Sequence, residues 1–293
     1  MVLFAVALLL VVDNDPNEIM KRMAENVEAS LEARRQYVYK QKVNAKLVRT
    51  NGQLARVERR EYTVTPKEKN TEKHLDLLAG EYHKSKKEII PYDKKGFEAK
   101  GAMDLDGSIM EDLIDDLIDD KKSRDGIPHS LFPISSKDLA AYRYTYAGST
   151  EVKGRKAHRI AYEPIPRKQR CPDAKDDDDK EDEEFCAWRP WKGEVLVDAE
   201  EFQPVRIYSD LTFKMPWAVK AFLGTNIQQT GFSVNYSRVA PNVWFPATYG
   251  TEFRVSLLFG YKRVITMSLD SSDFRRTSAS SEIQFETGET AKP

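Results

Sequence analysis

The chain has 293 residues, 40% of them hydrophobic, so it can bury a sizeable core. Its 46 Lys and Arg against 47 Asp and Glu argue against a nucleic-acid-binding protein, which usually carries a basic excess. Gly and Pro, 14 of each, are too scattered for collagen or a low-complexity chain, and no run of about 20 apolar residues predicts a membrane-spanning helix.

The N-terminus begins with an apolar run. Residues 2–12 read VLFAVALLLVV, which is too short to cross a bilayer of about 30 Å but suits the apolar region of a secretory signal peptide. No Lys or Arg precedes the run, and no small-residue cleavage site follows it. We therefore expect that Met1 of this sequence lies inside a longer signal peptide. The alternative is a buried first strand, which would need cover on both faces. We interpret residues 1–12 as a signal-peptide remnant and residues 13–293 as a single domain.

Only two cysteines occur, Cys171 and Cys186, and they bracket the acidic segment CPDAKDDDDKEDEEFC. In an exported protein such an isolated pair predicts a disulfide. Closing a loop of about 15 residues would contribute up to roughly 3 kcal/mol. No His or further Cys lies nearby, which argues against zinc. We interpret the acidic run as a solvated surface loop rather than a loose calcium site.

Two amphipathic helices are predicted. Asp15 is an N-cap candidate, Pro16 suits the first helical position, and apolar residues at helical spacing predict a helix from about 17 to 35. Residues 109–120, IMEDLIDDLIDD, repeat an apolar pair every four residues with acidic pairs between. This pattern predicts a helix with a strongly acidic outer face, and outward spacing favours solvation of its carboxylates over acid–base catalysis.

Most of the remaining chain favours β-strands. From Tyr37 to Leu47 apolar residues alternate with polar ones, Asn51-Gly52 is a hairpin turn signal, and a second strand follows. Residues 66–106 are polar and predict further short strands. From residue 142 onward, successive period-two segments argue for an antiparallel meander curled into an open or closed barrel. We expect a mainly β (α+β) fold, one large curved sheet with helices against its concave face.

One segment breaks the strand pattern. Residues 213–223 read FKMPWAVKAFL and lie between two predicted strands. They are too apolar for an ordinary loop, so they form either a short helix that plugs the sheet or the lip of an apolar cavity.

The sequence lacks the motifs of common enzyme classes. It contains no Gly-x4-Gly-Lys, Gly-x-Gly-x-x-Gly, Gly-x-Ser-x-Gly or His-Glu-x-x-His pattern. No two histidines lie at metal-ligand spacing, and His158 shares a predicted strand face with Ile160 and Tyr162, as a structural histidine would. Residues 104–107, DLDG, match a calcium loop only in part, because the glycine comes too early. We expect no catalytic residue, no metal and no cofactor.

Aromatic residues carry the remaining signal. The 13 Phe, 13 Tyr and 4 Trp are well represented on predicted strand faces, a surplus suited to the lining of a concave sheet. Such a hollow is filled by side chains, as in a packed core, or by an apolar ligand, and periodicity leaves both open. The candidate lining residues are Leu113, Leu117, Phe213, Trp217, Phe222, Trp244 and Phe259.

Several motifs occur together along the chain. In order, they are the helix PNEIMKRMAENVEASLEAR with the strand YVYKQKV, Tyr144–Gly148, Val152–Pro164, Gly193-x-Val195-x-Val197-Asp198, and Phe202-Gln203-Pro204-Val205-Arg206. Over residues 16–286 the chain resembles the outer-membrane lipoprotein-sorting proteins of Gram-negative bacteria, the group that contains the periplasmic lipoprotein carrier and related lipid sensors. The resemblance implies an unclosed antiparallel barrel whose helices cover an apolar hollow for acyl chains. The acidic 171–186 insertion and the greater length depart from the carrier.

The resemblance implies a periplasmic carrier of lipid or lipoprotein, with acyl chains as ligand and envelope proteins of the inner or outer membrane as further partners. Sheltering acyl CH₂ groups, each worth about 0.8 kcal/mol in water, requires no bond to be made or broken. The alternative is a non-carrying envelope sensor or protein-binding module on the same fold, with the acidic loop docking a basic partner. An enzyme would need a cluster of polar residues in the hollow.

Overall fold

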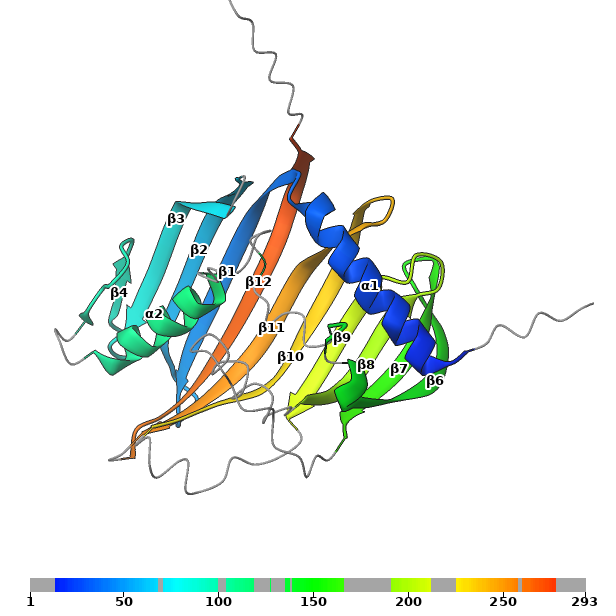
Figure 1. The fold of residues 1–293 in the computed structure, drawn as a ribbon. Coiled ribbons are helices and arrows are strands. Elements are labelled where there is room, and N and C mark those ends of the chain that lie inside the picture. The colour runs from blue at the N-terminus through cyan, green and yellow to red at the C-terminus, as the bar shows by residue number, and fades with distance from the viewer. Residues whose placement is uncertain are drawn as a thin grey trace, which may run out of the picture.

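A computed structural model describes residues 14–67, 71–99, 104–118, 127, 135–137, 139–165, 191–211, 225–257 and 260–277. These residues form one antiparallel sheet of eleven strands, with two α-helices packed on the same face (Figure 1). The helices are α1 (Pro16–Arg34) and α2 (Leu105–Ile118), and a short 3-10 helix, η2 (Leu139–Ala141), precedes β6. The strands are β1 (Tyr37–Arg49), β2 (Leu54–Pro66), β3 (Thr71–His83), β4 (Ile89–Tyr92), β6 (Tyr142–Val152), β7 (Arg155–Pro164), β8 (Trp191–Asp198), β9 (Pro204–Leu211), β10 (Thr225–Ala240), β11 (Val243–Leu257) and β12 (Lys262–Arg276).

The strand order is β4-β3-β2-β1-β12-β11-β10-β9-β8-β7-β6. Strands β1 to β4 step outward to one edge, and the chain then crosses to the opposite edge. From there β6 to β12 return as a meander until β12 pairs with β1. Within the described residues no ladder joins the two edge strands, β4 and β6. The sheet is therefore curved but unclosed, which confirms the expected mainly β fold with helices on the concave face (Figure 1).

Local sequence explains the first elements. The Asp15 carboxylate accepts a hydrogen bond from the Asn17 N–H at 2.9 Å and caps α1, and Pro16 occupies the first turn. Burial alternates along β1, so that every second residue faces the helices. Gly52 has φ +76°, a conformation that glycine adopts without strain, in the turn before β2. The predicted helix and hairpin are thus confirmed.

Two boundaries differ from the prediction. Helix α2 begins at Leu105, four residues before the predicted start, because the Asp104 carboxylate caps it by accepting from the Gly107 N–H at 3.2 Å. Strand β3 has 13 residues, where the sequence predicted short strands. In its first half, half-buried residues alternate with exposed ones and no side chain is fully buried. Polar residues are therefore tolerated on both faces, and the sequence shows no apolar residue at every second position.

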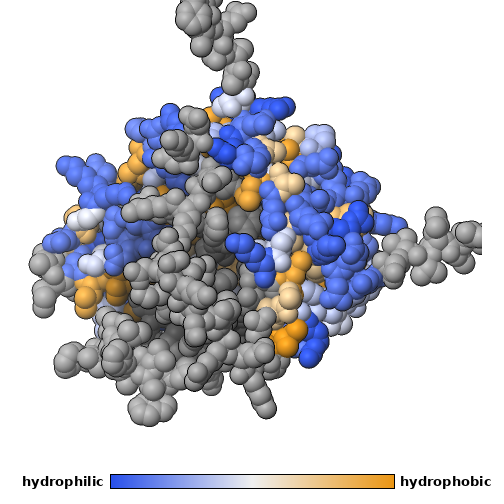
Figure 2. All heavy atoms as spheres, in the orientation of Figure 1, coloured by the Kyte–Doolittle hydropathy of each residue, from blue (hydrophilic) through white to orange (hydrophobic). Residues whose placement is uncertain are grey.

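The side of the molecule that carries the helices is hydrophilic over most of its described surface, and apolar residues show there only in small groups (Figure 2). Beneath this surface, one hydrophobic cluster packs both helices against the sheet. Its residues come from every strand that lies between β2 and β6 in the strand order, and from those two strands. Among the described residues, neither helix is long and apolar enough to cross a membrane.

Candidate ligand-binding face

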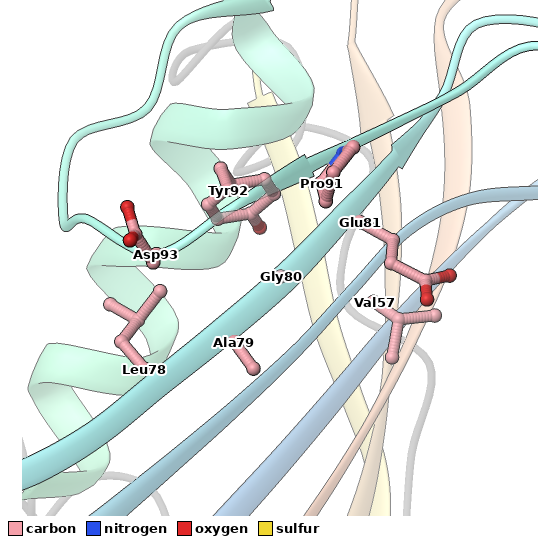
Figure 3. Close-up of a pocket in the computed structure, with 8 residues that line it drawn as sticks. All are labelled: Val57, Leu78, Ala79, Gly80, Glu81, Pro91, Tyr92 and Asp93. Carbon is pink, nitrogen blue, oxygen red and sulfur yellow. The ribbon is translucent and has the colours of Figure 1, made fainter.

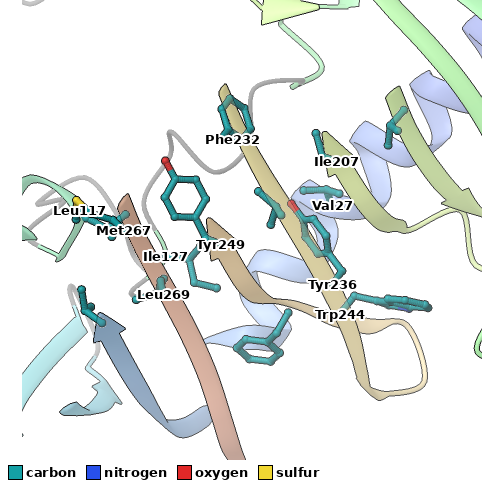
Figure 4. Packing of buried hydrophobic residues seen from close by; sticks show 14 of the residues in the cluster. Val27, Leu117, Ile127, Ile207, Phe232, Tyr236, Trp244, Tyr249, Met267 and Leu269 are labelled. Carbon is teal, nitrogen blue, oxygen red and sulfur yellow. The ribbon is translucent and has the colours of Figure 1, made fainter. Parts of the chain in front are cut away.

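The concave face of the sheet forms a continuous bed of apolar and aromatic side chains. At its centre, Leu269 of β12 pairs in register with Val43 of β1 on one side and with Tyr249 of β11 on the other. Two residues along β12 from Leu269, Met267 lies opposite Ala45. All five are buried, and Figure 4 shows Leu269, Met267 and Tyr249 among them. The buried residues that extend the bed across β10 and β9 are Phe232, Val234, Tyr236 and Ile207.

Helix α1 is fixed over one end of this bed by the turn between β8 and β9. The buried Asp198 carboxylate accepts two hydrogen bonds from Arg155, at 2.7 and 2.8 Å, and two from the backbone N–H groups of Glu200 and Glu201. Burial alone would raise the pKa of Asp198, but these hydrogen bonds together hold it below its ordinary value. The turn is therefore shaped by an ionised, fully buried carboxylate.

The same turn contacts α1 directly. Gln203 donates to the Asn26 carbonyl at 3.0 Å, and Asn26 donates to the Glu201 carbonyl at 2.8 Å. The Arg22 guanidinium lies 3.5 Å from the centre of the Phe202 ring. The Val-Asp and Gln-Pro-Val-Arg motifs of the sequence thus position a helix.

Trp244 belongs to this helix-anchoring region. Its side chain is buried, and its indole N–H donates to the Glu201 carboxylate at 2.6 Å. Arg238 pairs with the same carboxylate at 2.7 Å. Figure 4 places Trp244 beside Tyr236 and near Val27 of α1. Trp244 therefore lies on the apolar bed, with its one polar atom already bonded.

Helix α2 is held at its N-terminal end by two arginines. Asp104 pairs with Arg56 at 2.5 Å, and both side chains are buried. Asp106 pairs with Arg263 at 2.7 Å and accepts from the Tyr261 hydroxyl at 2.6 Å. The two carboxylates of the partial calcium motif therefore neutralise arginines. Among the described residues, no group of three His, Cys, Asp or Glu side chains is placed to hold a metal ion.

The middle of α2 is held by Arg60 of β2. This guanidinium is wholly buried and contacts Glu58 at 2.5 Å, Glu111 at 2.5 Å and Asp115 at 2.9 Å. The prediction that the acidic residues of this helix are solvated is wrong for Glu111 and Asp115, because both turn toward the buried cation. The acidic residues that remain exposed are Asp112 and Asp116.

The apolar side of α2 packs on the bed. Its buried residues are Met110, Ile114, Leu117 and Ile118. Of the predicted lining residues, Leu117 is buried near Met267 (Figure 4) and Leu113 is partly buried against the same cluster. The structure therefore brings Leu113, Leu117 and Trp244 to one face of the sheet. The predicted lining residues Phe213, Trp217, Phe222 and Phe259 lie outside the described residues, as do Cys171 and Cys186.

Burial keeps three titratable side chains of the concave face uncharged, namely Tyr62, Tyr162 and His158. Burial raises the pKa of Tyr162 and of Tyr62 above its ordinary value. Burial also lowers the pKa of His158, and the nearby Asp198 charge offsets only part of this effect. At neutral pH these side chains are neutral hydrogen-bonding groups, which suits the binding of an uncharged ligand.

A pocket of about 520 Å³ lies at the edge of the sheet, where β4 ends and covers only the last four residues of β3 (Figure 3). The Tyr92 ring lies over Gly80, so closely that a Cβ on Gly80 would fall 2.1 Å from it. The residues that line the pocket are Val57, Leu78, Ala79, Gly80, Glu81, Pro91, Tyr92 and Asp93. They come from both faces of the sheet, so this pocket is an edge feature and lies apart from the concave bed.

Two groups of inward-facing residues were not among the predicted site residues. Gln41 continues the alternation of β1 that Tyr39 and Val43 define, so the period of two was enough to find it. Arg56, Glu58 and Arg60 occupy every second position of β2, and a row of charged residues is the pattern of a solvated face. Only the position of α2 shows that they are buried.

No protein-family model and no curated protein sequence matches the chain. Several solved structures are similar to it. A DUF1329 family protein from Desulfovibrio piger is 13% identical, with 93% of this chain and 98% of that chain covered and a TM-score of 0.34. A putative outer membrane lipoprotein-sorting protein domain from Vibrio parahaemolyticus is 10% identical, with 90% and 95% covered and a TM-score of 0.31. A LolA superfamily protein from Nitrosomonas europaea is 9% identical, with 86% and 93% covered and a TM-score of 0.28.

The second of these structures carries the name of the group that the sequence resembles. With identities of 13% or less and TM-scores of 0.34 or less, the likeness carries no further argument. The fold therefore rests on the strand order and register described above.

Proposed function

We propose that this protein is a periplasmic carrier that shields the acyl chains of a lipid or lipoprotein on the concave face of its sheet. The observation that carries the proposal is the continuous apolar bed that runs from β1 across β12, β11 and β10 between the two helices. Each acyl CH₂ group that such a surface removes from water contributes about 0.8 kcal/mol to binding. The bed can therefore bind an acyl chain without a hydrogen bond or an ion pair to it.

The attachment of the helices supports this proposal. Charged and hydrogen-bonded contacts fix both helices near the ends of the bed, while the contacts over its middle are apolar and non-directional. Apolar contacts can be exchanged for an acyl chain at little cost, because both surfaces are hydrocarbon-like. Directional ion pairs such as Arg60–Glu111 and Arg56–Asp104 keep the frame in place during that exchange.

The second candidate is a non-carrying envelope sensor or protein-binding module on the same fold. Its supporting observation is the depth of packing, since the side chains of Val43, Ala45 and Leu47 are completely buried in the ligand-free chain. A bed that side chains already fill would serve as a core, and binding would then take place on the outer surface. The two candidates therefore differ in whether the bed admits a ligand.

Native mass spectrometry of the chain exported to a bacterial periplasm with a complete signal peptide separates the candidates. The carrier predicts a lipid-sized adduct that organic solvent removes. A clean ligand-free mass, together with no uptake of an apolar fluorescent probe, would contradict the carrier. The same spectrum tests the Cys171–Cys186 disulfide, because reduction of that bond adds the mass of two hydrogen atoms.

A further inference from the structure

Three polar side chains lie next to one another on the apolar bed. Gln41 of β1 pairs in register with Tyr62 of β2 on one side and with Ser271 of β12 on the other. All three occupy inward-facing positions, two residues along their strands from the buried Val43, Arg60 and Leu269. Their exposed fractions are 1%, 3% and 8%. We name these three residues the floor row.

Two other hydroxyl groups on the concave face are hydrogen-bonded within the chain. The Tyr162 hydroxyl donates to the Tyr208 carbonyl at 3.1 Å, and the Thr251 hydroxyl donates to the Gly231 carbonyl at 2.8 Å. The Ser271 hydroxyl differs, because it is buried and has no hydrogen-bond partner among the described residues. Buried hydroxyl groups in proteins are normally hydrogen-bonded, so an exception needs a reason.

Stability does not supply that reason. A buried hydroxyl that makes no hydrogen bond weakens the folded state relative to an alanine or a larger apolar residue at the same position. The preceding inward residue of β12 is Leu269, which packs fully in the cluster. A polar residue that a stable core does not require is typical of a binding site, where the ligand supplies the missing partner.

The charges around the floor row select the kind of ligand group. Next to Tyr62, the Arg60 guanidinium is already shared by Glu58, Glu111 and Asp115. An added carboxylate or phosphate would therefore find this guanidinium already neutralised. The row itself offers neutral groups, namely a hydroxyl that donates or accepts, an amide that does both, and a phenol that burial keeps protonated.

We propose that the floor row is a hydrogen-bonding subsite for the neutral linkage of an acyl chain, an ester or an amide, when that chain lies on the concave bed. This inference rests on the proposed carrier function and narrows its ligand class from any apolar molecule to acyl esters and amides. The next inward residue of β2 after Tyr62 is Val64, which pairs in register with Lys73 of β3, and Lys73 donates to the Ile118 carbonyl in the last turn of α2 at 2.6 Å. A linkage bound there would leave its chain on the bed formed by Val43, Leu269 and Tyr249.

Two fluorescent probes of equal chain length that differ only in the linkage test the inference, dodecylpyrene and the methyl ester of pyrenedecanoic acid. The full chain should bind the ester about 3- to 10-fold more tightly, the range expected for a single net hydrogen bond. Ser271→Ala and Gln41→Leu should each remove this preference and leave the Kd for dodecylpyrene unchanged. The matched control is Ser272→Ala, because Ser272 is the next residue on β12, exposed on the opposite face, and its loss should change neither Kd.

The possible outcomes are distinguishable. If both probes bind equally well to the unaltered chain, or if Ser271→Ala weakens both equally, the floor row is not a subsite, while the carrier function stands. If neither probe binds, the carrier function and the subsite both fail. Thermal unfolding without probe adds a second readout: Ser271→Ala should leave Tm unchanged or raise it. A lower Tm with the ester preference retained would show a purely structural serine and overturn the inference.

Discussion

The Glu111 carboxylate of α2 lies 2.5 Å from the Arg60 guanidinium of β2, and the Arg60 side chain is completely buried. Glu58 and Asp115 share the same guanidinium, so one cation joins the inner face of the sheet to one side of the helix. The neighbouring side of α2 is apolar and packs on β1 and its neighbours. Charge thus fixes the helix where the sheet is polar, and hydrophobic contact fixes it where the sheet is apolar.

Replacing Arg60 by methionine should destabilise the fold strongly. The substitution leaves Glu58 buried without its cation, and removing one partner of a buried ion pair typically costs about 3–5 kcal/mol. Urea unfolding of the full chain measures the change. Arg59→Met is the matched control, because Arg59 points outward and its ion pair with Glu61 is half exposed, so we expect a change of about 1 kcal/mol or less. Equal losses of unfolding free energy in the two variants would show that the buried Arg60 contacts stabilise the fold no more than an exposed ion pair does.

Replacing Gly80 by alanine should also destabilise the fold, by about 1–3 kcal/mol. The new Cβ would fall 2.1 Å from the Tyr92 ring, which would have to move away from Glu58, the acceptor of its hydroxyl at 2.7 Å. Gly250→Ala is the control, because its Cβ would meet Ser233 at an ordinary 3.7 Å. Thermal unfolding compares the two. An unchanged Tm for Gly80→Ala would mean that Tyr92 has room to shift at no cost.

Acid should weaken the anchor of α1 through Asp198. Its pKa is lower in the folded chain than in the unfolded chain, so the contribution is fully present above the unfolded value of about 3.9 and is lost as the pH falls through the folded value. Asp198→Asn should therefore lower stability at pH 7 and flatten its decline below about pH 4. Urea midpoints measured from pH 7 to pH 3 test this. A parallel decline in both proteins would exclude Asp198 as a source of the acid sensitivity.

The spacing of apolar residues and the helix-capping residues were enough to predict the first helix and the strand that follows it. Asp15 and Pro16 mark the start of α1, and the alternation from Tyr37 to Leu47 defines β1, because these signals are local in the sequence. The same patterns predicted one large curved sheet with helices against its concave face, and the resemblance implied that this sheet is unclosed. Strand number and register could not be predicted, because they depend on which strands pair across long sequence separations, such as β1 with β12.

The candidate site was predicted only in part, for a physical reason. Leu117 and Trp244 are apolar, so composition alone favours their burial, and both are buried. Arg60 and Glu111 are polar, and the buried Arg60 pairs with the half-buried Glu111 across 51 positions of sequence. Neither residue carries a signal of that pairing by itself. Gln41 was open to prediction from the alternation of β1, but its register with Tyr62 and Ser271 is visible only in the assembled sheet.

The two leucines at different depths on α2 give a direct test of the carrier function. Leu113 is partly buried against the apolar cluster, whereas Leu105, two turns earlier, is 50% exposed. If acyl chains lie between α2 and the bed, Leu113→Ala should weaken binding of an apolar fluorescent probe about 3- to 10-fold. The substitution removes about three carbon groups, each of which contributes part of its contact surface to the probe. Leu105→Ala should leave the Kd within twofold of the unaltered chain. Circular dichroism controls for loss of the helix in both variants. Equal Kd values for the two variants and the unaltered chain would place any bound probe away from α2, and Leu113 would then be a residue of the packed core alone.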